Sequence, residues 1–125
     1  MITQITTDIK QAADALRANQ VIGIPTETVY GLASNALSPE AVSNIFSVKQ
    51  RPTSNPLILH FANLEQAESY IQEFHGELKV LYDHFSPGPI TFLVPKTALV
   101  PNEITSGSSL VAVRFPSHPQ FLALL

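Results

Sequence analysis

The chain has 125 residues, of which 45% are hydrophobic and 14% are charged, and its formal net charge is −3. This length fits one domain that buries roughly two-thirds of its unfolded surface, and the acidic balance argues against a generally basic surface for nucleic acid. The absence of cysteine excludes disulfides, thiolate nucleophiles and zinc–thiolate sites. Since no apolar run is long enough to span a bilayer, we expect a cytoplasmic protein with no membrane partner.

The first half of the chain predicts two helices separated by two short strands. Thr7 and Asp8 are good capping residues for a helix that ends near residue 19. Residues 21–25 predict a buried strand, and residues 29–33 predict a second one. A Ser-Pro-Glu sequence then favours a helix over residues 38–48, because proline is tolerated at the first helical position.

The second half of the chain predicts further strands and helices in alternation. The expected elements are a strand over 57–62, helices over 64–73 and 77–85, a strand over 90–94, a polar loop over 95–109, a strand over 110–115 and a helix over 118–125 capped by Ser117. Strands that are apolar on both faces and alternate with amphipathic helices predict a layered α/β domain. The last helix is apolar to its end and has no stop signal, so we expect a domain truncated at its C-terminus.

Two of the seven cations, Lys49 and Arg51, fall within three residues of each other at the exit of a predicted helix. Arginine grips phosphate with a bidentate fork and lysine acts as a point charge, so this pair favours an anionic ligand. Cations that stabilise the helix C-terminus against the macrodipole are an equally good interpretation. Asn55 either contacts the ligand or, as local sequence favours, makes an Asx turn before Pro56.

His60 and Arg114 each interrupt an otherwise apolar strand. A lone histidine in such a strand is more often a core residue than a ligand contact. A buried guanidinium, however, needs an anionic partner, because burying it unpaired is very costly. That partner is either a carboxylate of the chain, such as Glu27, or a carboxylate of a substrate. Thr28 adds a hydroxyl at a strand end, a common ligand-binding position in α/β domains.

Other site chemistries lack support in the sequence. The five glycines are too scattered for a Walker loop or a dinucleotide fingerprint. The four histidines show no ligand spacing and no accompanying acidic cluster, so no protein metal site is expected.

Five ordered segments together resemble the YrdC-like domain of threonylcarbamoyl-AMP synthases. They are Pro-Thr-Glu-Thr-Val-Tyr-Gly-Leu at 25–32, Lys-Gln-Arg-Pro at 49–52, Asn-Pro-Leu-Ile-Leu-His at 55–60, Pro-Gly-Pro-Ile-Thr at 87–91 and Val-Ala-Val-Arg-Phe-Pro at 111–116, followed by His118-Pro119. The resemblance implies one YrdC-like domain over residues 1–125, with a twisted mixed sheet flanked by helices and a concave ligand pocket. Family members continue past Leu125 into a Ser-x-Asn segment and a glycine-containing loop that complete the nucleotide pocket, so the C-terminal part of the family domain is expected to be absent.

The resemblance also implies an activity and its partners. L-threonine, bicarbonate and ATP would give threonylcarbamoyl-AMP and pyrophosphate, with Mg²⁺ accompanying the ATP and no metal site on the protein. The product would serve a separate tRNA threonylcarbamoyl transferase complex, which modifies adenosine in certain tRNAs.

Residue roles carry over from the resemblance one position at a time. Thr28, His60 and Arg114 match threonine-site positions, and Lys49, Arg51 and Asn55 match nucleotide contacts. Lys49 and Arg51 are also the expected catalytic residues, because neutralising the triphosphate is the main demand of this chemistry.

Two alternatives stay open at this point. One is a YrdC-like RNA-binding module without catalysis, which would contact tRNA or double-stranded RNA. The other is a related carbamoyl-adenylate-forming domain of the kind found in hydrogenase maturation proteins.

Overall fold

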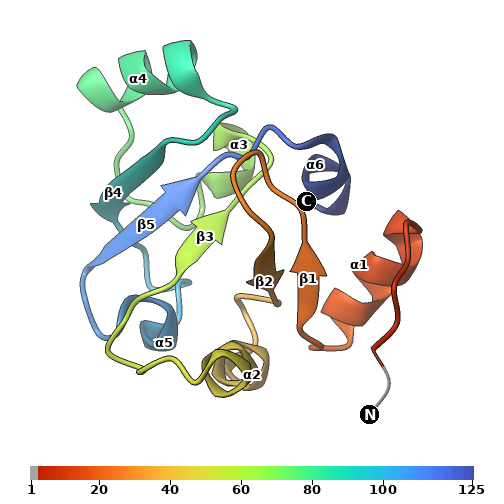
Figure 1. Ribbon diagram of the computed structural model, residues 1–125. Coiled ribbons are helices and arrows are strands. Elements are labelled where there is room, and N and C mark those ends of the chain that lie inside the picture. The colour runs from red at the N-terminus through yellow and green to blue at the C-terminus, as the bar shows by residue number, and fades with distance from the viewer. Residues whose placement is uncertain (1–2) are drawn as a thin grey trace.

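The strands form two small β-sheets, as the computed structural model shows (Figure 1). In the first sheet, β1 (Ile22–Ile24) pairs antiparallel with β2 (Gly31–Ala33). In the second sheet, β5 (Leu110–Arg114) lies between β3 (Ile58–His60), which is parallel to it, and β4 (Thr91–Pro95), which is antiparallel. The predicted α/β class and mixed sheet are therefore confirmed.

The structure describes residues 3–125, and the helices surround the two sheets (Figure 1). They are α1 (Ile9–Arg17), α2 (Pro39–Lys49), α3 (Leu64–Ala67), α4 (Glu77–Phe85), α5 (Asn102–Thr105) and α6 (Pro119–Leu124). Among the helices within residues 3–125, none is long and apolar enough to cross a membrane.

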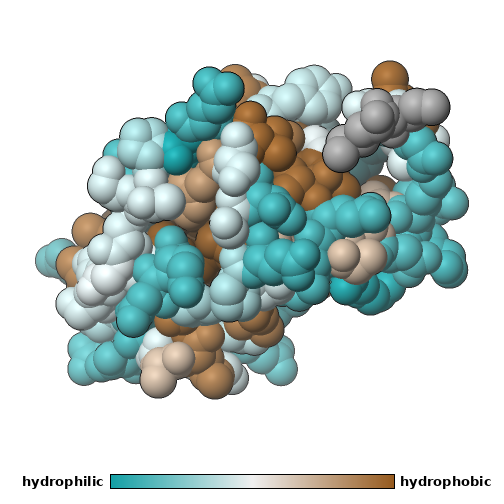
Figure 2. All heavy atoms as spheres, turned by 90° about the horizontal axis from the view of Figure 1, so that it is seen from below, coloured by the Kyte–Doolittle hydropathy of each residue, from teal (hydrophilic) through white to brown (hydrophobic). Residues whose placement is uncertain are grey.

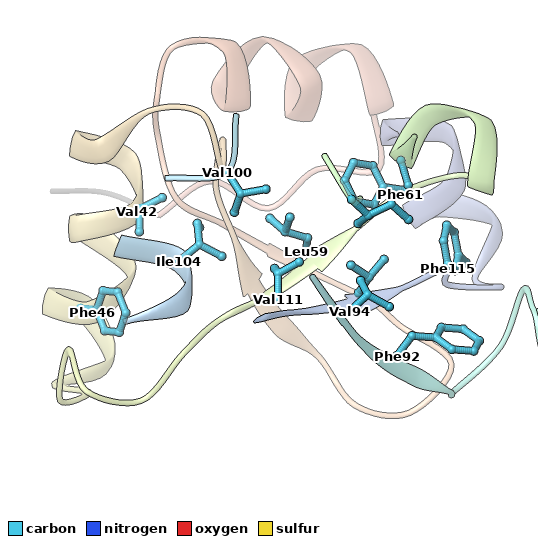
Figure 3. Close-up of a cluster of buried hydrophobic side chains, with 13 residues drawn as sticks. Val42, Phe46, Leu59, Phe61, Phe92, Val94, Val100, Ile104, Val111 and Phe115 are labelled. Carbon is cyan, nitrogen blue, oxygen red and sulfur yellow. The ribbon is translucent and has the colours of Figure 1, made fainter. Parts of the chain in front are cut away.

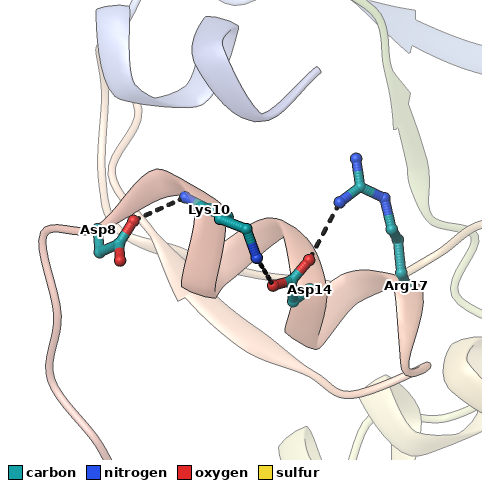
Figure 4. Close-up of polar contacts among 4 residues, drawn as sticks. All are labelled: Asp8, Lys10, Asp14 and Arg17. Carbon is teal, nitrogen blue, oxygen red and sulfur yellow. Dashed lines mark hydrogen bonds and ion pairs between the residues drawn. The ribbon is translucent and has the colours of Figure 1, made fainter.

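The starts of the two N-terminal helices follow from local capping. The Asp8 carboxylate accepts a hydrogen bond from the Lys10 N–H at 2.9 Å, and Asp14 then pairs with Lys10 and Arg17 along the exposed side of α1 (Figure 4). At the start of α2, the Ser38 hydroxyl accepts a hydrogen bond from the Ala41 N–H at 3.2 Å. The cap of α1 and the start of α2 were both predicted, because each depends only on residues within one turn.

The hydrophobic core lies on one face of the mixed sheet (Figure 3). The sheet contributes Leu59, Phe92, Val94, Val111 and Val113, while α2 and α5 contribute Val42, Phe46 and Ile104. Phe115, which is almost fully buried, is in aromatic contact with Phe61, Phe74, Tyr82 and Phe92. Hydrophobic side chains also remain visible between hydrophilic ones on the face seen from below (Figure 2), so burial of apolar surface is incomplete.

The expectation that the strands are buried on both faces is wrong for β4 and β5. Exposed or half-exposed residues alternate with buried ones along each of these strands, and Leu93 and Leu110 keep 63% and 39% of their surface exposed. The core cluster covers only the face that carries Val94 and Val111. The opposite face carries His60 and Arg114, so one-sided burial leaves these polar side chains half-buried and outside the hydrophobic core.

Other differences lie where long-range hydrogen bonds override helical periodicity. The helix expected over 64–73 ends at Ala67, because the backbone at Tyr70 and Gln72 instead pairs with Thr97 and Pro95 at and just beyond the end of β4. The expected polar loop over 95–109 contains α5, whose residue Ile104 is buried in the core.

The cap of the last helix also differs from the prediction. His118, not Ser117, caps α6, and its Nδ1 accepts a hydrogen bond from the Gln120 N–H at 3.2 Å. The backbone N–H of Ser117 is hydrogen-bonded elsewhere, to Glu27.

Candidate functional site

The loop between β1 and β2 is ordered by the side chain of Thr26. Its Oγ1 accepts hydrogen bonds from the N–H groups of Thr28 and Val29, both at 3.1 Å. Side-chain bonds of this kind fix a tight turn without a regular ladder. Thr28 is left exposed, with its Oγ1 3.1 Å from the Thr26 hydroxyl. The loop therefore presents a hydroxyl pair at the end of β1.

Arg114 and His60 are neighbours in the parallel pairing of β5 with β3. The Arg114 Nε and Nη2 groups donate to the Thr91 hydroxyl at 3.1 and 2.9 Å. The expected burial of the guanidinium is wrong, since Arg114 is half-buried. Within residues 3–125 it forms no ion pair with a carboxylate, Glu27 included. An accessible guanidinium without a counter-ion is a candidate anion contact.

His60 is held in its neutral form. Burial, aided by the positive charge of Arg114, lowers its pKa to about 4, while Glu27 acts weakly in the opposite direction. The imidazole packs against the Phe121 ring of α6, with 5.0 Å between ring centroids. At neutral pH this side chain therefore offers a hydrogen-bond donor and an acceptor, without a charge.

Glu27, in the same loop as Thr28, is ionised although burial raises its pKa. The backbone N–H groups of Ser117, Glu27 and His118, with the charge of Arg114, outweigh burial and lower the pKa below its usual range. Its Oε2 accepts a hydrogen bond from the Ser117 N–H at 3.0 Å.

Lys49 and Arg51 leave the C-terminal end of α2 in different environments. Gln50 takes the left-handed conformation, with φ of 51°, and ends the helix. Lys49 is exposed in the last turn of α2, where its positive charge also interacts favourably with the negative end of the helix dipole. The Arg51 guanidinium donates to the Pro56 carbonyl at 2.9 Å and more weakly to the Asn55 carbonyl at 3.4 Å. Arg51 therefore also orders the loop that follows it.

A cleft of about 640 Å³ collects most of the predicted site residues. Its lining includes Thr28, Lys49, Arg51, His60 and Arg114. Asn55 is not among the lining residues, and its N–H instead closes a turn on the Pro52 carbonyl at 3.0 Å. A cleft of this size, mostly apolar with a few convergent polar groups, is typical of small-molecule sites.

Arg17 and Phe121 are among the lining residues that were not singled out from the sequence. Arg17 enters from the end of α1, and Phe121 enters from α6. Neither had a distinguishing local signal, because a cation in a last helical turn and an aromatic residue in an apolar helix are both ordinary. With Arg17, four of the seven Lys and Arg residues line the cleft.

Comparison with known proteins gives consistent matches over nearly the whole chain. The Sua5/YciO/YrdC family model, described as "Telomere recombination", matches residues 14–125. The threonylcarbamoyl-AMP synthase of Pyrococcus abyssi is 46% identical over 117 residues, covering 94% of this chain and 34% of that protein. The synthase of Bacillus subtilis is 43% identical over 118 residues, again covering 94% and 34%.

A solved structure shares the fold. The crystal structure of P. abyssi Sua5 complexed with L-threonine aligns with a TM-score of 0.90 at 46% identity, covering 93% of this chain and 34% of that one. The chain thus spans about a third of the length of these relatives.

Proposed function

The chain belongs to the Sua5/YciO/YrdC family, and on that premise we propose that it is a threonylcarbamoyl-AMP synthase domain. Its cleft would bind L-threonine, bicarbonate and ATP and form threonylcarbamoyl-AMP and pyrophosphate. The names of the P. abyssi and B. subtilis relatives support the threonine enzyme over a related carbamoyl-adenylate-forming domain.

One observation carries this proposal: the charge of the cleft opposes the charge of the protein. Four cations line the cleft although the net charge of the chain is −3, and three of them (Lys49, Arg51 and Arg114) form no ion pair within residues 3–125. Among the described residues that line it, none is aspartate or glutamate. A concentration of positive charge in a partly apolar hollow attracts and retains polyanions such as a nucleoside triphosphate.

The end of the cleft near β3 and β5 would hold the amino acid. Arg114 has donors available for a carboxylate, and a charged hydrogen bond of this kind is usually worth about 1.5–3 kcal/mol. Neutral His60 and the hydroxyl of Thr28 offer hydrogen bonds to uncharged polar groups of the substrate. The L-threonine in the P. abyssi structure supports threonine as a ligand of the family.

The end of the cleft near the exit of α2 would hold the triphosphate. Lys49 supplies an exposed charge, while Arg51 supplies a guanidinium whose orientation is already fixed by backbone carbonyls. We retain Asn55 as a proposed nucleotide contact, since it follows these residues in the same loop. Mg²⁺ would arrive with the ATP, because phosphate oxygens suit it and the lining residues offer it no carboxylate.

The chemistry asks mainly for position and charge neutralisation. The threonine amine captures CO₂ or bicarbonate to form a carbamate, and a carbamate oxygen bonds to the α-phosphorus as the bond to pyrophosphate breaks. Lys49 and Arg51 would stabilise the negative charge that develops on the phosphates, and Arg114 would orient the nucleophile. Neither role needs a protein acid or base.

The same proposal includes a later consumer of the product. A tRNA threonylcarbamoyl transferase complex in the cytoplasm would take the adenylate. Direct contact between this chain and tRNA would be detected as salt-dependent binding.

A pyrophosphate-release assay tests the proposal directly. Release should require ATP, L-threonine and bicarbonate together, with the full-length P. abyssi enzyme as the positive control. Calorimetric titration with threonine and with ATP should be run beside it, because binding and turnover are separate requirements. A chain that folds but binds neither ligand would refute the proposal.

A further inference from the structure

Glu27 joins two segments that lie 90 residues apart in the sequence. Besides the 3.0 Å bond from the Ser117 N–H, its Oε2 lies 3.5 Å from the Ser117 hydroxyl. Its other oxygen, Oε1, is buried and has no hydrogen-bond partner among the described residues. Glu27 itself does not line the cleft. Glu27 can therefore act on the cleft in two ways, through the segments that it connects and through its charge, which acts weakly on His60.

Both connected segments form walls of the cleft. Glu27 precedes Thr28 in the loop after β1, and Ser117 stands just before α6. From α6, Phe121 is buried at 4% exposure and packs on His60. The bond between Glu27 and Ser117 therefore sets the distance between the Thr28 loop and the helix that covers His60.

The choice of a carboxylate for this contact has an energetic cost. A partly buried carboxylate with one unpaired oxygen is unfavourable unless its other interactions are strong. A hydrogen bond to an ionised acceptor is roughly twice as strong as a neutral one, and the lowered pKa of Glu27 keeps the acceptor ionised. A neutral side chain would avoid the cost of the charge but would hold α6 more weakly.

We propose that Glu27 is a positioning residue, which holds α6 against the Thr28 loop and so shapes the end of the cleft that binds the amino acid. The inference rests on the proposed function for the identity of that ligand. The contact itself is a property of the ligand-free protein and is tested without any ligand.

Two substitutions of Glu27 separate position from charge. Glu27→Gln keeps an oxygen that accepts the Ser117 N–H but removes the charge, whereas Glu27→Ala removes both. The readout is the pKa of His60, followed by NMR titration of its imidazole protons.

If Glu27 positions α6, Glu27→Ala loosens the cover over His60, and its pKa rises from about 4 toward 6.5 as burial is relieved. Glu27→Gln should leave this pKa at or below the wild-type value, because the charge of Glu27 raises it. If Glu27 acts through its charge alone, both variants lower the pKa of His60. Equal shifts in the two variants would therefore overturn the inference.

The partner of Glu27 provides an independent arm. Ser117→Pro removes the N–H donor and should reproduce the rise seen in Glu27→Ala, and the double variant should add little to either single one. Glu73→Ala is the matched control, because Glu73 is an exposed glutamate. A Ser117→Pro protein that folds and keeps the wild-type pKa of His60 would contradict the positioning role.

A ligand-binding arm connects the inference to the proposed function. Glu27→Ala should weaken threonine binding about tenfold or more, the loss expected for a charged hydrogen bond, and leave ATP binding within about twofold. A similar loss of affinity for threonine and for ATP would indicate a general structural role and overturn the inference. If the wild-type chain binds no threonine, the proposed function fails for this chain, while the pKa of His60 still decides the role of Glu27.

Discussion

The neutral state of His60 predicts a loss of stability in mild acid. Its pKa is about 4 in the folded chain, against 6.5 for an ordinary histidine. Between these values the unfolded chain binds a proton that the folded chain does not bind. The free energy of unfolding should therefore fall as the pH decreases from 6.5 toward 4, and His60 should cause no pH dependence above that range.

The size of the effect follows from the two pKa values. Linkage gives a loss of about 2 kcal/mol between pH 7 and pH 5, and about 3 kcal/mol by pH 4. The carboxyl groups with lowered pKa, Glu27 and Asp14, start from ordinary values of 4.5 and 3.8. Their stabilising charge is present above those values and is lost as the pH falls further. The contribution of these two carboxyl groups therefore stays small between pH 7 and pH 5.

Urea denaturation of the wild type and His60→Phe at pH 7, 6 and 5 measures this effect. Phenylalanine keeps an aromatic ring against Phe121 but cannot titrate, so the variant should lose about 2 kcal/mol less than the wild type between pH 7 and pH 5. His75→Phe, at an exposed position, is the matched control for exchanging histidine for phenylalanine. Equal slopes for the wild type and His60→Phe would refute the argument that this imidazole is buried in its neutral form.

Three further predictions concern the cleft and the core. Arg114→Ala should weaken threonine binding by about 1.5–3 kcal/mol, and a folded variant with wild-type threonine affinity in calorimetry would contradict its carboxylate role. Lys49→Ala should weaken ATP binding while the free energy of unfolding changes by no more than about 0.5 kcal/mol. Arg51→Ala should weaken ATP binding and also lower the free energy of unfolding, because it removes hydrogen bonds to two loop carbonyls. A binding defect confined to threonine in either variant would count against the assignment. Phe115→Ala should lower the free energy of unfolding, measured by urea denaturation, by about 3–5 kcal/mol. Phe85→Ala, at a position 59% exposed, should lower it by less than about 1 kcal/mol. Similar losses of free energy in the two variants would show that the core is centred elsewhere.

The sequence predicted best those features that depend on neighbouring residues. Asp8 and Ser38 cap their helices within one turn, and α4 begins and ends at the predicted residues 77 and 85. The cations at 49 and 51 could be singled out because they follow the end of a helix. The end of α3 at Ala67 could not be predicted, because it depends on pairing with residues beyond β4.

The partners of the charged residues were the least predictable part of the site. Sequence reasoning offered Glu27 as a partner for Arg114, and the charge of Arg114 does help to lower the pKa of Glu27. The hydrogen bonds run elsewhere, since Arg114 donates to Thr91 and Glu27 accepts from the backbone of Ser117. The sequence shows which charged side chains need a hydrogen-bond partner. The strand register and the direction of α6 decide which group becomes that partner.

The sequence by itself therefore determined most of the elements, the starts of α1 and α2, the cations available for an anionic ligand and the family resemblance. Only the tertiary structure decided that Thr28, His60 and Arg114 lie in one cleft with Lys49 and Arg51, and that Glu27 connects its loop to α6. The physical reason is one of range. Capping and periodicity act within a turn or two of the chain, whereas the cleft is assembled by strand pairing and hydrogen bonds between residues as many as 90 positions apart.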